Sequence, residues 1–173
     1  MQTLRFTSEQ VVWQEVPHEV SLAFLISGCP LRCEGCHSAD SWKSGLGEVL
    51  TVEYLQGRLK RYQGLISCVL FMGGEWQAAE LARLLAAVKT AGLKTCLYTG
   101  LEGEELAALS DGLLPQLDYL KTGRWLAERG GLDSPHTNQR LIDLHTGQVL
   151  NHLFLKKIPI TPIARQALAG IGH

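Results

Sequence analysis

Hydrophobic residues along this chain gather in four short runs, each ending in a small or polar residue followed by glycine. The runs cover residues 20–26, 66–72, 93–98 and 117–121. Continuous apolar runs of this length, bounded by glycine, are typical of buried strands. The sequence therefore predicts four buried strands.

The spacing typical of amphipathic helices occurs between these runs. Thr51 is a candidate N-cap for a helix that ends near Tyr62, and acidic residues open a helical segment at 102–109. A further helix, with Gly92 as its candidate end, has apolar residues at i, i+3, i+4 and i+7 in Leu81, Leu84, Leu85 and Val88. We therefore expect a helix between successive strands.

Strand-like patterns also occur towards both ends of the chain. Residues 4–6 and 11–16 alternate as strands do, and residues 140–144 and 148–153 resemble a hairpin around 145–147. With the alternating strands and helices between them, these patterns predict an α/β fold with a mostly parallel sheet.

Several chemically distinctive segments follow the predicted strands directly. They are the cysteine-containing loop at 29–36, the stretches 73–75 and 98–100, and Lys121 at the end of the fourth strand. Functional sites in parallel sheets form beyond the carboxyl ends of the strands. We therefore expect these segments to meet at one site.

Length and charge narrow the possible classes. The 173 residues suit one domain, expected at 1–158, followed by a tail or short helix at 159–173. The net charge of −1 gives no electrostatic case for nucleic acid or a membrane surface, and the apolar stretches fall short of a membrane span. Residues 1–6 do not resemble a secretion signal, so we expect a cytoplasmic protein.

Three cysteines form the most specific pattern in the chain. Cys29, Cys33 and Cys36 have the spacing Cys-x3-Cys-x2-Cys, and soft thiolates in one short loop suit an iron–sulfur cluster. A cubane cluster has one iron more than these thiolates can ligate, which leaves an iron open for chemistry. Cys68 and Cys96 lie in apolar runs and are interpreted as buried small hydrophobic residues.

Other interpretations of the cysteines compete with the cluster. Structural zinc usually has four protein ligands, and His37, directly after Cys36, is poorly spaced to be the fourth. Cys33 to His37 also matches the attachment pattern for c-type haem, but that pattern leaves Cys29 unexplained. A redox-active dithiol at Cys33 and Cys36 stays open, although the third cysteine argues against it.

The other strand-end residues allow two interpretations each. Gly73 and Gly74 supply either a tight turn or space for a ligand to approach the backbone, with Glu75 facing its ammonium group. Thr99 either ends a strand or offers a polar contact to a ribose or carboxylate. Lys121 is either a solvated strand-end lysine or a partner for a carboxylate.

The cysteine loop at 27–37 resembles the radical S-adenosylmethionine superfamily, and within it the chain most resembles the anaerobic ribonucleoside-triphosphate reductase activating proteins. The narrower resemblance rests on four further stretches, 71–75, 98–106, 118–125 and 137–143. The chain departs from the family pattern at three positions. Trp76 stands where proline is frequent, Gly35 where an aromatic residue is frequent, and Ser38 where asparagine is frequent.

The resemblance implies an incomplete TIM-type βα barrel with a [4Fe–4S] cluster on Cys29, Cys33 and Cys36, which are then the catalytic centre. S-adenosylmethionine would chelate the open iron. Its other contacts would be Gly73, Gly74 and Glu75 at the ammonium group, Thr99 and Lys121 at the ribose or carboxylate, and Gly35, Cys36 and His37 at the adenine.

The resemblance also implies partners. They are a glycyl-radical enzyme, foremost anaerobic ribonucleoside-triphosphate reductase, and a one-electron donor such as flavodoxin or ferredoxin. The alternatives are another short radical enzyme, such as a 7-carboxy-7-deazaguanine synthase or a different glycyl-radical activase, and a non-catalytic iron–sulfur or zinc-binding module.

Overall fold

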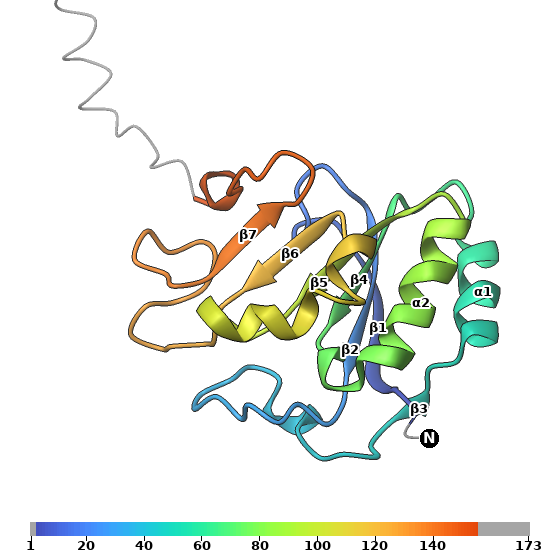
Figure 1. The fold of residues 1–173 in the computed structure, drawn as a ribbon, viewed down its shortest axis with the longest axis horizontal. Coiled ribbons are helices and arrows are strands. Elements are labelled where there is room, and N and C mark those ends of the chain that lie inside the picture. The colour runs from blue at the N-terminus through green and yellow to red at the C-terminus, as the bar shows by residue number, and fades with distance from the viewer. Residues whose placement is uncertain (1–2, 156–173) are drawn as a thin grey trace, which may run out of the picture.

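The computed structural model describes residues 3–155, which form one seven-stranded sheet against helices (Figure 1). The strands lie in the order β3-β1-β2-β4-β5-β6-β7. Their bounds are β1 Arg5–Val12, β2 Ser21–Ile26, β3 Glu48–Val49, β4 Cys68–Met72, β5 Lys94–Tyr98, β6 Tyr119–Thr122 and β7 Arg140–Asp143.

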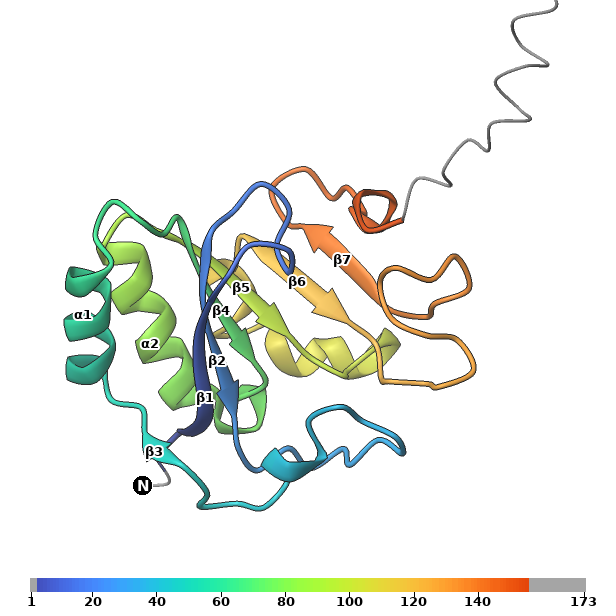
Figure 2. The same cartoon turned by 180° about the vertical axis from the view of Figure 1, so that it is seen from behind.

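The four central strands β2, β4, β5 and β6 run parallel, whereas β1, β3 and β7 pair antiparallel at the edges. These central strands match the four apolar runs of the sequence. The sheet is twisted and does not close on itself (Figure 2). The expected α/β fold and incomplete barrel are therefore confirmed.

Within residues 3–155, two α-helices cover one face of the sheet side by side (Figures 1 and 2). Helix α1 spans Val52–Arg61, and the Thr51 hydroxyl accepts a hydrogen bond from the Tyr54 N–H at 3.0 Å, so the predicted N-cap is present. Helix α2 spans Ala78–Thr90. The third predicted helical segment is a 3-10 helix, Gly103–Leu109. None of the helices within residues 3–155 is long and apolar enough to cross a membrane.

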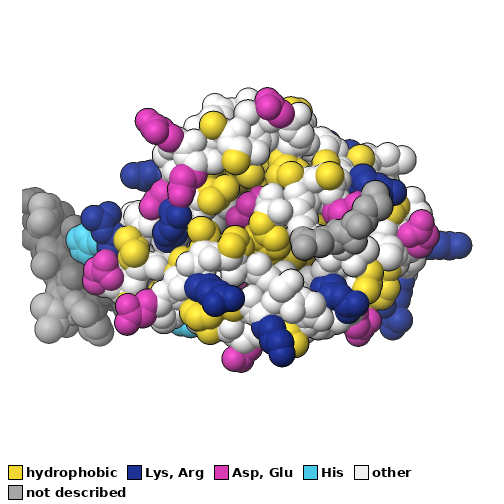
Figure 3. Space-filling model, turned by 60° about the horizontal axis from the view of Figure 1, so that its bottom comes forward, with side chains coloured by type: hydrophobic (Ala, Val, Ile, Leu, Met, Phe, Trp, Pro, Cys, Tyr) yellow, Lys and Arg dark blue, Asp and Glu magenta, His cyan; other side chains and the backbone are white. Residues whose placement is uncertain are grey.

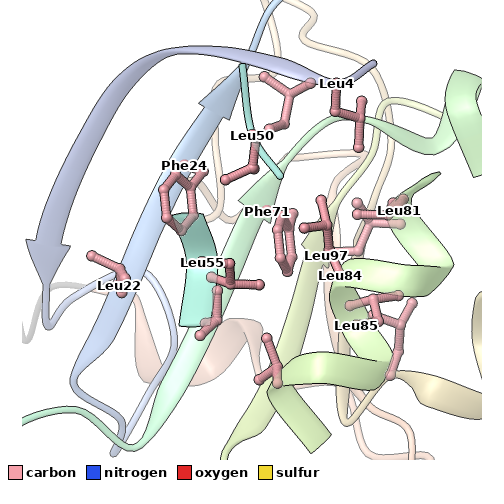
Figure 4. Packing of buried hydrophobic residues seen from close by; sticks show 14 of the residues in the cluster. Leu4, Leu22, Phe24, Leu50, Leu55, Phe71, Leu81, Leu84, Leu85 and Leu97 are labelled. Atoms are coloured by element: carbon pink, nitrogen blue, oxygen red, sulfur yellow. The ribbon is translucent and has the colours of Figure 1, made fainter. Parts of the chain in front are cut away.

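Two hydrophobic clusters lie on opposite faces of the sheet. The larger packs the sheet against α1 and α2 and includes Phe24, Phe71 and Leu85 (Figure 4). The smaller, here called the inner cluster, includes Val16, Leu70 and the two fully buried cysteines. Cys68 and Cys96 are thus core residues, as expected.

The sequence patterns near both ends were partly wrong. Strand β1 is one continuous strand that stops at Val12, and Val16 instead turns into the inner cluster. Residues 148–153 do not form a strand, because only Val149 bridges to Ile142 and Asn151–Leu153 is a 3-10 helix. The expected tail at 159–173 lies outside the described residues.

A buried carboxylate ties several elements together at the amino ends of the strands. Asp118, 5% exposed, accepts hydrogen bonds from Lys89 of α2 at 2.9 and 3.1 Å and from the Thr95 N–H of β5 at 2.8 Å. His145 Nε2 lies 2.6 Å from the same carboxylate. Burial by itself would raise the pKa of Asp118, but the bonds from His145, Lys89 and Thr95 outweigh it and lower the pKa to about 2.

We expect Asp118→Asn to lower the free energy of unfolding at pH 7 by about 2 kcal/mol, because a lowered pKa stabilises the fold once the carboxylate is ionised. This contribution is complete above the ordinary pKa of 3.8 and is lost as the pH falls towards 2. Urea unfolding of the wild type and of Asp118→Asn between pH 7 and pH 3 measures the difference in their free energies of unfolding. This difference should become smaller below about pH 4.

Glu80→Gln is the control, because the exposed Glu80–Arg83 pair on α2 should contribute less than about 1 kcal/mol. A difference between wild type and Asp118→Asn that stays constant over this pH range would contradict the assignment.

Candidate functional site

The carboxyl ends of the parallel strands open onto a pocket of about 520 Å³. It lies at the edge of the sheet crossed by the cysteine loop, on the face shown in Figure 3, where hydrophobic side chains gather in the middle. Eight of the predicted site residues line it, namely Cys29, Cys33, Cys36, His37, Gly73, Glu75, Thr99 and Lys121. The sequence segments expected to meet therefore do meet.

The cysteine loop is held in a tight, irregular conformation after β2. The Gly28 N–H donates to the Ser41 carbonyl at 2.8 Å, and the Cys36 N–H donates to the Cys33 carbonyl at 3.1 Å. The three cysteines are free thiols, half-buried at the pocket. Burial raises the pKa of Cys29 above its usual value.

The cysteines do not form a site for a single ion. Within residues 3–155, no three His, Cys, Asp or Glu side chains converge tightly enough to hold one metal ion. Thiolates that bind a multi-iron cluster stand further apart than the ligands of one zinc, because each binds a different iron. The three thiols line one pocket without converging on the position of a single ion.

Glu75 is the most unusual carboxylate of the pocket. Its Oε1 accepts a hydrogen bond from the Thr99 hydroxyl at 2.6 Å, whereas Oε2 is buried and has no hydrogen-bond partner among residues 3–155. Burial raises the pKa of Glu75, and the bond from Thr99 opposes this effect. A buried carboxylate oxygen without a donor fits a cationic ligand group, such as an ammonium.

The two glycines before Glu75 differ in what they face. A Cβ at Gly73 would lie 2.6 Å from the indole of Trp76, and the backbone there has φ +91°. At Gly74, which does not line the pocket, a Cβ would point at Ile26 and Leu4 in the core. Gly73 thus exposes its backbone to the pocket, while Gly74 shapes the turn.

Lys121 extends into the pocket rather than into solvent. Its Nζ donates to the Gly123 carbonyl at 3.1 Å and lies 5.7 Å from the centre of the Tyr98 ring. Burial lowers the pKa of Lys121 to about 8, although Cys33, Cys36 and Glu75 favour its charged form. The amine is therefore placed to meet an anionic ligand group.

The sequence analysis did not name Trp125 of the pocket wall as a site residue. Trp125 follows β6 and packs edge-on against His37, with ring centroids 4.8 Å apart. Gly35 is exposed and does not line the pocket, and a Cβ there would be 3.5 Å from Trp125 Nε1. Trp125 follows a predicted strand end, as the recognised residues do, and this position was the available signal.

Comparisons with known proteins agree with this chemistry. The model of the 4Fe-4S single cluster domain family matches residues 19–142. A pyruvate formate-lyase-activating enzyme of Clostridium pasteurianum is 32% identical over 103 residues, covering 54% of this chain and 43% of that protein. A biotin synthase of Stenotrophomonas maltophilia is 28% identical over 116 residues, covering 60% of this chain and 33% of that protein.

The chain thus matches less than half the length of either relative. The family match, in contrast, extends over most of the chain and includes the cysteine loop and the strand ends around the pocket. A [4Fe–4S] cluster and S-adenosylmethionine are accordingly its cofactors. The chain belongs to the 4Fe-4S single cluster domain family and, with these relatives, to the radical S-adenosylmethionine superfamily.

Proposed function

We propose that this chain is a glycyl-radical activase, which cleaves S-adenosylmethionine reductively and generates a radical on a glycine of anaerobic ribonucleoside-triphosphate reductase. The observation that carries the proposal is the pocket itself, where three free thiols and an unpartnered buried carboxylate oxygen lie together. The similarity to a pyruvate formate-lyase-activating enzyme supports an activase.

Each pocket residue has a role in this proposal. Cys29, Cys33 and Cys36 hold the cluster. Glu75 Oε2 and the Gly73 backbone receive the ammonium group of S-adenosylmethionine, and Lys121 receives its carboxylate. When bound and reduced, the cluster supplies the electron that cleaves S-adenosylmethionine into methionine and a 5′-deoxyadenosyl radical.

Thr99 and the aromatic side chains support this chemistry. The Thr99 hydroxyl fixes one Glu75 oxygen and leaves the other for the ligand. The Cys36 and His37 backbone lies beside the adenine. Trp76, Leu132 and Phe154 give the pocket apolar walls that exclude water from a reactive radical.

The shape of the fold favours a protein substrate. The sheet is an open barrel, and hydrophobic side chains gather on the face that carries the pocket (Figure 3). A partner loop carrying the glycine could enter from this face and complete the enclosure. A flavodoxin or ferredoxin is the proposed electron donor.

A radical enzyme acting on a small molecule is the second candidate. Biotin synthases match as much as 67% of this chain, which favours this reading. Such an enzyme would use the same thiols and carboxylate but would consume S-adenosylmethionine without a protein partner.

We expect the anaerobically reconstituted and reduced protein to form a glycyl radical on the reductase, together with one 5′-deoxyadenosine for each radical. Electron paramagnetic resonance and chromatography measure the two products. The reductase with its radical-bearing glycine replaced by alanine is the control. Turnover of S-adenosylmethionine with a small substrate alone, and no radical on the reductase, would support the second candidate instead.

We expect Cys29→Ser, Cys33→Ser and Cys36→Ser each to abolish the visible absorption of the cluster and the cleavage of S-adenosylmethionine, since each removes a thiolate ligand. Cys68→Ala is the matched control, because Cys68 is a buried core residue on the inner cluster. Iron and sulfide analysis after reconstitution measures the cluster content of the three loop variants and of the control. Full cluster content in any of the three loop variants would contradict its assignment as a ligand.

We expect Glu75→Gln to bind S-adenosylmethionine about tenfold to a hundredfold more weakly, because it loses a charge-assisted hydrogen bond to the ammonium group. Equilibrium dialysis of the cluster-loaded protein gives the dissociation constant, with Glu80→Gln on α2, which does not line the pocket, as the control. Unchanged affinity at full cluster content would remove Glu75 from the ligand site.

A further inference from the structure

Trp125 joins two segments that are far apart in the sequence. It belongs to the segment after β6, yet its ring meets His37 with centroids 4.8 Å apart and an angle of 62° between the planes. Its Nε1 lies 3.5 Å from the position that a Cβ of Gly35 would occupy. The indole therefore lies against the turn between Cys33 and Cys36, at the wall of the pocket.

The indole N–H of Trp125 has no acceptor among the described residues. Nε1 is buried from solvent, and none of the side chains or carbonyls within residues 3–155 accepts a hydrogen bond from it. Leaving a buried hydrogen-bond donor unsatisfied is unfavourable for the folded protein. Such a group at a pocket wall therefore indicates an acceptor on the molecule that binds there.

The backbone around Trp125 is firmly held. The Arg124 guanidinium donates two hydrogen bonds of 2.7 Å to the carboxylate of Glu105. The Arg124 carbonyl accepts hydrogen bonds from the side-chain amides of Asn138 at 3.0 Å and Gln139 at 3.4 Å. The indole donor is thus positioned before any ligand binds.

We infer that Trp125 positions the nucleoside of S-adenosylmethionine, its indole N–H donating a hydrogen bond to a ring nitrogen of adenine. This inference rests on the ligand arrangement in the proposed function. Glu75 and Lys121 provide for the charged groups of the methionine part, which leaves the nucleoside for the remaining donor. Within the nucleoside, we assign the donor to an adenine ring nitrogen rather than to a ribose oxygen, and deaza analogues test that choice. The rings of Trp125 and His37, set at 62° to each other, also offer aromatic surface that a base can contact.

The test compares S-adenosylmethionine with its 1-deaza, 3-deaza and 7-deaza analogues, each of which lacks one ring-nitrogen acceptor. Dissociation constants are measured anaerobically on the cluster-loaded wild type, Trp125→Phe and Trp13→Phe. Trp13 is 69% exposed and gives the matched control. We expect Trp125→Phe to bind S-adenosylmethionine about fivefold to tenfold more weakly and Trp13→Phe to bind it normally.

The analogues identify the acceptor. One of the three should bind the wild type about fivefold to tenfold more weakly than S-adenosylmethionine does, and Trp125→Phe should not distinguish the two. The wild-type series does not depend on how the variant folds, and if no analogue binds the wild type more weakly, the inference is overturned.

The midpoint potential of the cluster tests whether the indole N–H donates to a cluster sulfur instead of to adenine. If Trp125→Phe shifts this potential while the affinity for S-adenosylmethionine is unchanged, the N–H donates to a cluster sulfur and the inference is wrong. Affinity does not depend on a protein partner. Failure to activate the reductase would therefore overturn the proposed function and leave the role of Trp125 intact.

Discussion

The parallel pairing of the central strands is the constraint on which the site depends. The register aligns Leu25 of β2, Met72 of β4, Tyr98 of β5 and Lys121 of β6 in one row across the sheet. Because these strands run in one direction, whatever follows the row in each strand lies at the same edge. The cysteine loop, Gly73 and Thr99 all follow it, so ordinary strand pairing assembles the pocket from distant parts of the chain.

The charged form of a buried side chain is stabilised at the amino ends of the strands and disfavoured at the carboxyl ends. At the amino ends, the Asp118 carboxylate is fully hydrogen-bonded, and its low pKa marks a contribution to stability. At the carboxyl ends, burial raises the pKa of Glu75 and lowers that of Lys121, so both charges are disfavoured in the free protein. A zwitterionic ligand reverses both effects. The site therefore lowers the stability of the ligand-free fold, and ligand binding restores that stability.

The sequence predicted the central strands, α1 and α2 because continuous apolar runs and helical periodicity report burial directly. The strand predicted at 148–153 was wrong, because the Asn151 side chain makes hydrogen bonds at β7 that a paired strand would otherwise make. Asn151 accepts from the Leu141 N–H and donates to the Gln139 carbonyl, taking the place of backbone partners of β7. Site residues at strand ends were predictable from their position. Trp125 also follows a strand end, but that position alone does not reveal its contacts with the distant Gly35 and His37.

Two departures from the family pattern, Trp76 and Gly35, have the same structural feature. In each, a tryptophan lies over a glycine that has a left-handed backbone, Trp76 over Gly73 and Trp125 over Gly35. At Gly73 both the φ of +91° and close contact disfavour a side chain, since a Cβ would be 2.6 Å from the indole. At Gly35 the φ of +69° rather than contact disfavours one. Next to the cysteine motif, the aromatic surface is thus supplied by Trp125 from the segment after β6, where it can also present a hydrogen-bond donor.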